Sequence, residues 1–196
     1  IQKNKEKYGH EIPFTILVDP TTACNKHCIG CWAADYNKAL NLSFEQLDKL
    51  FTEGKELGIY FYIMTGGEPL VRKKDILRLA EKHDDCVFMI FTNGTLIDQQ
   101  FCEDLCRLGN IVPTISVEGF DDATDGRRGK GSWKDIMRAM DLMKLNKVPF
   151  GFSTCFTTAN CDSVLSDKFI DLMIDKGAFF SWYFTFMPVG CGTDTS

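Results

Sequence analysis

Three cysteines in one short stretch carry the clearest chemical signal in this sequence. They are Cys24, Cys28 and Cys31, spaced Cys-x3-Cys-x2-Cys after an apolar, strand-like segment at residues 14–18. Thiolates at this spacing can converge on one soft-metal site. A structural zinc site normally takes four protein ligands, often as two paired knuckles, and no second knuckle follows here. A cubane iron–sulfur cluster can use three thiolates, with its fourth iron open; the alternative is three unrelated buried or reactive cysteines.

Further polar and glycine-rich motifs each follow an apolar run that predicts a strand. Gly66-Gly67-Glu68-Pro69 follows residues 59–64, Thr92-Asn93-Gly94 follows residues 86–91, and Ser116-Val117-Glu118-Gly119 closes residues 111–117. A pair of glycines permits positive φ angles and a close backbone approach to a ligand. Each motif alone is also compatible with a plain turn, because Gly-Gly, Glu-Pro and Asn-Gly are common loop pairs.

The cysteine spacing resembles the signature of the radical S-adenosylmethionine (radical SAM) superfamily. One detail departs from that pattern: the residue before the third cysteine is usually aromatic there, whereas here it is Gly30, with Trp32 after Cys31. The resemblance implies a [4Fe-4S] cluster on the three cysteines and S-adenosylmethionine (SAM) bound to the open iron. It also implies that an electron from the cluster cleaves SAM to a 5′-deoxyadenosyl radical, which abstracts hydrogen from a substrate.

The same resemblance implies a set of SAM-binding residues on the loops that follow the strands. We expect Gly66–Pro69 to accept hydrogen bonds from the SAM ammonium and Ser116 and Glu118 to help hold SAM, although the family has Asp where Glu118 stands. Asn160 and the Met187-Pro188 pair are assigned to the ribose and adenine by position alone. The expected SAM site therefore comprises Gly66, Gly67, Glu68, Pro69, Thr92, Asn93, Ser116, Glu118, Arg128, Asn160 and Met187.

Residues 128–133 resemble a segment of the peptide-modifying (SPASM-type) branch of the family. The segment begins with Arg128, whose planar guanidinium can donate two hydrogen bonds to a carboxylate. A solvated charged loop is an equally good interpretation of these residues.

The remaining cysteines give weaker signals. Cys102 and Cys106 share a helix face at metal-compatible spacing, but residues of this kind more often fill a core. Cys86 and Cys155 lie inside predicted strands and are expected in the core. Two others follow strands and could join an auxiliary cluster: Cys161 and Cys191.

The surrounding pattern alternates strands with helices. Apolar runs predict strands at residues 14–18, 59–64, 86–91, 111–117, 149–157 and 179–187. Helical spacing predicts helices at 43–57, 73–83, 98–108, 132–145 and 163–176, with capping boxes at Ser43 and Ser132. We expect a bulge at Pro113, a polar loop at 121–131 and no clear pattern in residues 1–13.

Alternation of this kind predicts an α/β fold with a parallel sheet and right-handed crossovers. A doubly wound sheet would fit it too. We favour a partial (β/α)6 TIM-like barrel, because every unusual motif follows a strand and barrels build active sites at the C-terminal ends of their strands. The family resemblance implies the same fold.

Composition limits the cellular setting. The chain has 196 residues, 44% of them hydrophobic, and a net charge of −5, so no basic surface for nucleic acid is expected. No membrane span or signal peptide is visible. Nine cysteines, an odd number without a secretory signal, argue against a disulfide framework and favour a reducing cytoplasm.

The chain is expected to divide into a leading segment at 1–13, a radical SAM partial barrel at 14–190, and at 191–196 the start of a C-terminal extension. Expected partners are an electron donor such as flavodoxin or ferredoxin, and as substrate a peptide or other natural-product precursor. The alternative is a non-enzymatic iron–sulfur or zinc-binding module for electron transfer or regulation. Such a module would not need the motifs at 66–69 and 116–119.

Overall fold

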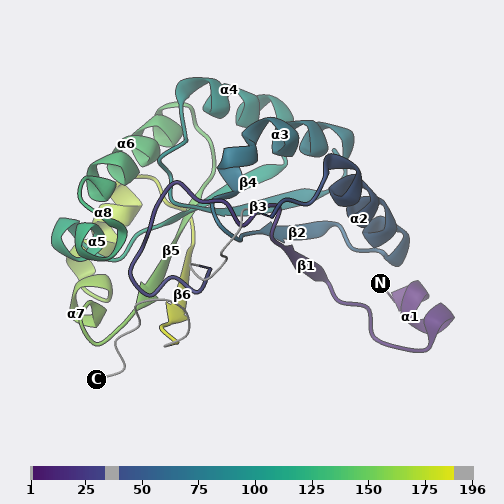
Figure 1. Cartoon of the computed structure of the whole chain (residues 1–196), viewed down its shortest axis with the longest axis horizontal. Helices are drawn as coiled ribbons and strands as arrows, with labels where there is room; N and C mark the ends of the chain where they lie inside the picture. The colour runs from purple at the N-terminus through teal and green to yellow at the C-terminus, as the bar shows by residue number, and fades with distance from the viewer. Residues whose placement is uncertain (1, 34–39, 188–196) are drawn as a thin grey trace.

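A curved sheet of six parallel strands forms the centre of the molecule (Figure 1). The computed structural model describes residues 2–33 and 40–187. Neighbouring strands pair in chain order from first to last, without the reversal that a doubly wound sheet requires. The strands are β1 (Thr15–Val18), β2 (Phe61–Met64), β3 (Val87–Thr92), β4 (Ile111–Ser116), β5 (Gly151–Phe156) and β6 (Ser181–Thr185). The predicted partial barrel is confirmed.

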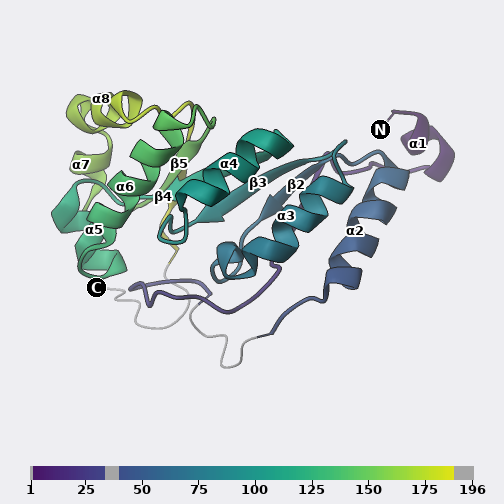
Figure 2. The ribbon, with the colours of Figure 1, turned by 90° about the horizontal axis from the view of Figure 1, so that it is seen from above.

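Helices cover one face of this sheet. Figures 1 and 2 show the main helices on the convex side, each between two successive strands. They are α2 (Phe44–Leu57), α3 (Lys73–Lys82), α4 (Gln99–Leu108), α6 (Ser132–Leu145) and α8 (Asp167–Asp175). Shorter elements are α1 (Gln2–Tyr8), the 3-10 helix η1 (Pro69–Arg72), α5 (Asp121–Arg128) and α7 (Cys161–Val164). Because every strand runs the same way, all the strand-to-helix loops lie at one edge.

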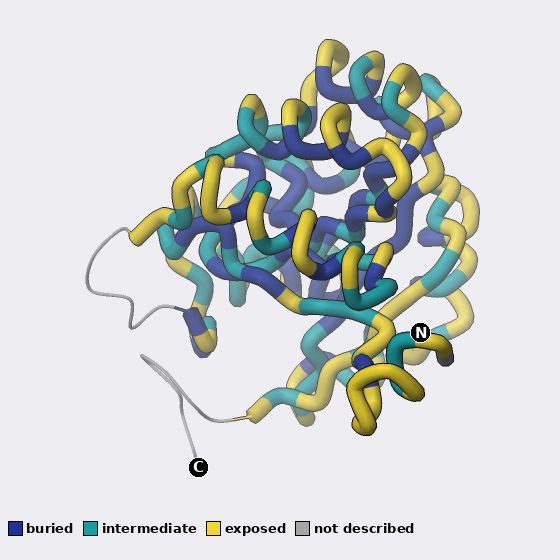
Figure 3. The backbone as a smooth tube through the Cα atoms, turned by 90° about the vertical axis from the view of Figure 1, so that its right-hand side faces the viewer, coloured by how far each residue is buried: buried dark blue, intermediate teal, exposed yellow. Residues whose placement is uncertain are grey.

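The hydrophobic core lies between the helices and the convex face of the sheet. Phe51 of α2 contacts Tyr62 of β2 and Phe88 of β3, with ring centroids 4.6 and 5.1 Å apart. All three side chains are fully buried, and burying such a ring stabilises the fold by about 1.5–3 kcal/mol. In Figure 3 the helices are buried on the side that faces the sheet and exposed on the other.

A different, partly exposed aromatic cluster involves the last strand. Phe91 of β3 packs on Trp182 and Phe184 of β6, with ring centroids 5.5 and 5.7 Å apart. Tyr183 alternates with them and packs on Phe152 of the helix-covered core instead. The period-2 geometry of strands therefore assigns Phe91, Trp182 and Phe184 to the concave side of the sheet.

Several expected boundaries were wrong. Residues 2–8 form helix α1 and residues 121–128 form helix α5, where no pattern and a polar loop had been expected. The last predicted helix is two helices, because Ser166 caps a new one by accepting a hydrogen bond from the Phe169 amide. Pro113 causes no bulge: the β3–β4 register is continuous across it, and the β4–β5 pairing begins only at Thr114.

The start of α6 also differs from expectation. Ser43 and Gln46 form the predicted capping box of α2, but Ser132 is the first residue of α6, not its cap. Asp125 of α5 caps α6 from outside, accepting hydrogen bonds from the amides of Gly131 and Trp133, both at 2.7 Å. Sequence spacing missed this cap because the carboxylate belongs to the preceding helix.

Candidate functional site

The cysteine-bearing segment after β1 is bonded directly to the Gly-Gly turn after β2. The amide of Gly67 donates to Thr21 O at 3.0 Å, and the amide of Glu68 donates to Ala23 O at 2.8 Å. A Cβ atom on Gly67 would lie 2.2 Å from Ala23 O. The close backbone approach expected toward a ligand is therefore made here toward the chain itself, which places the cysteines beside this turn.

Glu68 is buried and connects two of the strand-end loops. Its carboxylate accepts hydrogen bonds from the Thr92 hydroxyl and the Asn93 amide, both at 2.7 Å, and from the Leu70 amide at 3.0 Å. Burial raises the pKa of this carboxyl, while the bonds from Asn93 and Thr92 oppose the rise. The side chain of Glu68 thus joins the loop after β2 to the loop after β3.

The cysteine loop is also bonded to the loop after β3 and to α6. Asn93 donates to the Asn25 side chain at 2.8 Å, Asn25 donates to the Thr95 hydroxyl at 2.8 Å, and Lys26 donates to the Ser132 hydroxyl at 3.0 Å. The predicted residues Thr92 and Asn93 therefore lie against this loop. Sequence reasoning missed Asn25 and Lys26, although their positions between Cys24 and Cys28 could have suggested them.

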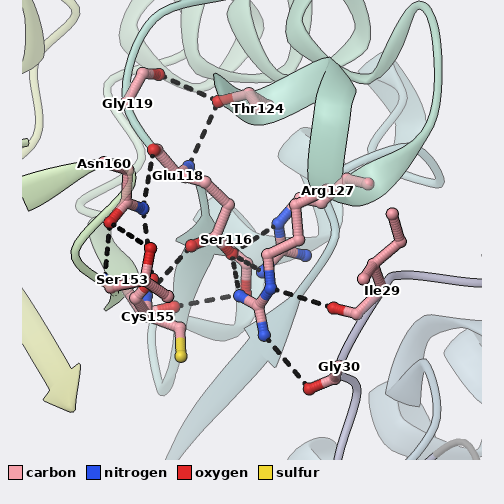
Figure 4. Close-up of polar contacts among 12 residues, drawn as sticks. Ile29, Gly30, Ser116, Glu118, Gly119, Thr124, Arg127, Ser153, Cys155 and Asn160 are labelled. Carbon is pink, nitrogen blue, oxygen red and sulfur yellow. Dashed lines mark hydrogen bonds and ion pairs between the residues drawn. The ribbon is translucent and has the colours of Figure 1, made fainter. Parts of the chain in front are cut away.

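Glu118 is at the centre of a buried charge cluster (Figure 4). Its Oε1 atom accepts from Arg127 Nη1 at 2.6 Å and from Arg128 Nε at 2.8 Å, and its Oε2 atom accepts from the Cys155 amide at 3.1 Å. The Glu118 side chain is 1% exposed and the two arginines are 19% and 14% exposed. The carboxylate partner of Arg128 is therefore internal, and the solvated-loop interpretation was wrong for Arg128, although Gly129 and Lys130 of the same segment are exposed.

Arg127 extends this cluster to the cysteine loop. Its Nε atom donates to the carbonyl of Ile29 at 3.2 Å and its Nη2 atom to the carbonyl of Gly30 at 3.4 Å. The Ile29 amide donates back to the carbonyl of Arg127 at 2.9 Å. Figure 4 shows Arg127 between Glu118 and the Ile29–Gly30 segment. Sequence reasoning missed Arg127; the signal that could have found it is the second arginine beside Arg128.

The other predicted residues lie at the same edge with different exposure. The hydroxyls of Ser116 and Ser153 are 3.2 Å apart on neighbouring strands. Asn160 is buried and donates to the carbonyls of Glu118 and Cys155 at 3.0 and 3.2 Å. Met187 is 71% exposed, and Pro188 lies outside the described residues. Binding of SAM by any of these residues remains a prediction.

The three cysteine thiols have the chemistry that an iron–sulfur cluster requires. Cys24 is exposed, and Cys28 and Cys31 are half-buried. Although Cys24 as a whole is exposed, desolvation of its sulfur raises the pKa of the Cys24 thiol, and negative charge on Glu68, Cys28 and Cys31 adds to the rise. Burial also raises the pKa of Cys28, and the positive charges of Arg128 and Arg127 oppose this.

The donor chemistry of this loop suits an iron–sulfur cluster. In the part of the chain that the structure describes, no group of three His, Cys, Asp or Glu side chains is arranged to hold a single metal ion. A cubane spreads its thiolates over different irons, so it needs no convergence on one atom. The donor set is therefore three soft thiolates on a loop bonded to its neighbours, which fits a cluster.

The remaining cysteines are distributed differently. Cys86 and Cys102 are buried, as expected for core residues. Cys155 is half-buried beside Glu118, so its assignment to the core was wrong. Cys106 is exposed, and its thiol donates to the Asn146 carbonyl at 3.2 Å. Cys161 is half-buried at the start of α7, and Cys191 lies outside the described residues.

Known proteins resemble this chain in sequence and in fold. The Radical SAM superfamily profile matches residues 18–165. GTP 3′,8-cyclase of Campylobacter lari is 30% identical over 86% of the chain and 53% of that protein. Sporulation killing factor maturation protein SkfB of Bacillus subtilis is 28% identical over 86% of the chain and 41% of that protein.

A solved structure, Streptococcus suis SuiB bound to S-adenosylmethionine, superposes with a TM-score of 0.81 at 17% identity, covering 97% of this chain and 45% of SuiB. The chain spans about one third to three fifths of the length of the curated relatives it matches. Among the described residues, no helix combines the length and apolarity that a membrane crossing demands.

Proposed function

The chain belongs to the radical SAM superfamily, a superfamily of enzymes, and from this membership we propose that it binds a [4Fe-4S] cluster through Cys24, Cys28 and Cys31 and cleaves SAM reductively. The observation that carries the proposal is the set of bonds from the cysteine loop to the turn after β2, to the loop after β3 and to Arg127. Because the cysteine loop is bonded to three other segments, its three thiols stay together at the C-terminal ends of the strands.

When bound, the cluster supplies the single electron that splits a carbon–sulfur bond of SAM to give the 5′-deoxyadenosyl radical. The proposed role of the chain's own residues is to hold and orient the cluster and SAM. Backbone groups of the Gly66–Pro69 turn and the hydroxyls of Ser116 and Ser153 line the edge where SAM is proposed to bind, next to the cysteine loop. Thr92, Asn93 and Asn160 support these loops through the hydrogen bonds described above. The aromatic cluster of Phe91, Trp182 and Phe184 gives the concave face an apolar wall that helps exclude water.

The proposed substrate is a peptide. Two findings support this: the relative SkfB is a maturation protein for sporulation killing factor, and SuiB has been solved bound to its precursor peptide SuiA, with a TM-score of 0.80 to this chain. The partly exposed aromatic residues of the concave face offer apolar contact to the side chains of a peptide, a substrate larger than a small metabolite. A reduced flavodoxin or ferredoxin is the proposed electron donor.

The test is anaerobic reconstitution followed by incubation with SAM and dithionite. The protein should contain about four irons, show thiolate-to-iron absorption that the reductant bleaches, and release 5′-deoxyadenosine. Cys28→Ala should lose the iron and the product together. Cys106→Ala is the matched control, because it removes an exposed thiol on α4, and it should retain both.

Zinc in place of iron, or a loaded cluster that never yields 5′-deoxyadenosine, would refute the proposal. Zinc would favour the non-enzymatic binding module. Full iron content in Cys28→Ala would instead place the cluster on other cysteines.

A further inference from the structure

Arg127 makes three hydrogen bonds to the described part of the cysteine loop, and no family motif used above includes it. Its guanidinium bonds Glu118 with one nitrogen and the carbonyls of Ile29 and Gly30 with the other two. These two residues are the ones between Cys28 and Cys31. Ninety-eight residues of sequence separate Arg127 from Ile29, so only the fold brings the two together.

The contacts restrain the turn between the second and third cysteines. The Cys31 amide donates to the Cys28 carbonyl at 3.3 Å, and Gly30 has a φ of 63°. Reciprocal bonds join Ile29 and Arg127, one through the Ile29 amide and one through its carbonyl. A turn with bonds at its amide and at two successive carbonyls has little freedom to rotate its peptide units.

The group of charged side chains around Arg127 also has a net charge. One carboxylate, Glu118, faces two guanidinium groups, so the three side chains sum to +1. Low exposure limits screening of this charge by solvent. The reduction potential of an iron–sulfur cluster depends on nearby charge and on hydrogen bonding around its ligands.

We propose that Arg127 is a positioning residue for the cluster: it fixes the Cys28–Cys31 turn against Glu118, and its positive charge makes the cluster easier to reduce. This inference rests on the proposed function, since it assumes that the three cysteines hold a cluster. It adds a residue that acts through the Ile29 and Gly30 carbonyls. The charge of Arg127 favours the extra electron, and its fork keeps the turn in one conformation.

Two measurements test this on the full chain. The first is hydrogen–deuterium exchange before reconstitution at the Ile29 and Cys31 amides, which bond the carbonyls of Arg127 and Cys28. The second is the midpoint potential of the reconstituted cluster without SAM. Arg127→Gln should raise the exchange rate several-fold and shift the potential to a more negative value. Arg127→Lys should keep the potential near wild type, because charge remains. It should still raise the exchange rate, because one ammonium group cannot reproduce the hydrogen bonds that the planar guanidinium donates to Ile29, Gly30 and Glu118.

Arg107→Gln is the matched control. Arg107 also makes charged contacts with its guanidinium, here to the two carboxylates Glu81 and Asp104, but it is 53% exposed on α4. It should change neither readout. If Arg127→Gln does not fold, as judged by circular dichroism, Arg127→Lys decides through the exchange rate alone.

A loaded cluster with wild-type potential and wild-type exchange in Arg127→Gln would overturn this inference and leave the proposed function intact. Equal shifts in Arg107→Gln would overturn it as well, because the effect would then be general. Failure of the wild-type chain to take up iron would overturn both the proposed function and the part of this inference that concerns potential.

Discussion

Single residues at this site act mainly by joining loops. Glu68 and Glu118 were predicted from their motifs as direct SAM contacts, and both carboxylates are buried and accept several hydrogen bonds from the chain. A buried carboxylate without partners would be strongly unfavourable, so these bonds are a condition of its burial. The SAM-facing groups are therefore expected among backbone atoms and hydroxyls such as that of Ser116.

Glu118→Gln should destabilise the fold by roughly 3–5 kcal/mol, the usual cost of removing one partner from a buried ion pair. The neutral amide would leave two poorly exposed arginines without their counter-charge. The free energy of unfolding measured by denaturant titration checks this, with the exposed Glu103→Gln on α4 as control. A loss of unfolding free energy below about 1 kcal/mol, the range of surface ion pairs, would show that the ion pairs of Glu118 are already well solvated.

At the scale of elements, short loops and caps decide where the site forms. The Gly66–Gly67 turn places β2 against the cysteine loop, and α5 supplies both the arginines for Glu118 and the Asp125 cap of α6. Helix α5 therefore links the start of α6 with the cysteine loop, although its sequence had been interpreted as a polar loop.

Gly67→Ala should lower both iron loading and SAM affinity. The new Cβ would lie 2.2 Å from the carbonyl oxygen of Ala23, so the cysteine loop must shift. Iron content and equilibrium binding of SAM measure the effect. Gly126→Ala in α5 is the control, because its Cβ meets nothing within 4 Å and alanine favours the helix by about 0.5–1 kcal/mol. Normal cluster content in Gly67→Ala would mean that the loop can move away without losing its thiols.

Asp125→Ala should lower the free energy of unfolding by about 1–2 kcal/mol at neutral pH, as expected for loss of a helix cap. Hydrogen bonds from the Trp133 and Gly131 amides hold the pKa of Asp125 below its ordinary value of 3.8. A carboxyl whose pKa is lower in the folded state stabilises the fold at pH values above its unfolded pKa. This stabilisation is lost as the pH falls through the folded pKa.

The difference between Asp125→Ala and wild type should therefore be constant near neutrality and shrink in acid below about pH 4. Urea titrations at several pH values check this, with the exposed Asp84→Ala as control. A difference that grows in acid would show the opposite sign and exclude the cap as its cause.

For the whole molecule, the site depends on segments that follow four successive strands of the sheet. The cysteine loop leaves β1 at one edge of the sheet, yet its bonds reach the loops after β2, β3 and β4. A ligand that binds across these loops should stabilise the entire fold rather than one segment.

SAM should raise the melting temperature when the cluster is present. At 100 times its dissociation constant, a ligand that binds only the folded state contributes about 2.7 kcal/mol. For a domain of this size, that is roughly 5–11 °C. Calorimetry of the reconstituted and metal-free chain measures it. A much smaller shift is expected without the cluster, since the proposed open iron is then missing; equal shifts would indicate that SAM binds independently of the cysteines.

The order of elements and the position of the motifs could be predicted from sequence. Apolar runs and helical spacing gave all six strands and the main helices, because these signals act over a few neighbouring residues. The placement of Cys24, Gly67, Thr92 and Ser116 at one edge followed from strand direction alone. The short helices α1 and α5 were missed and α7 was not separated from α8, since the stability of such helices depends on capping and packing more than on local periodicity.

Only the tertiary structure decided which groups the functional residues contact. The residues concerned are Glu118, Arg127, Gly67 and Asp125. Each of these side chains or turns meets a partner from another loop, and the Arg127–Ile29 pair is 98 residues apart in sequence. Residue type shows that a carboxylate or guanidinium needs a partner when buried, but many partners satisfy the same chemistry. The fold selects one of them, because only strand register and loop path determine which groups come within hydrogen-bonding distance.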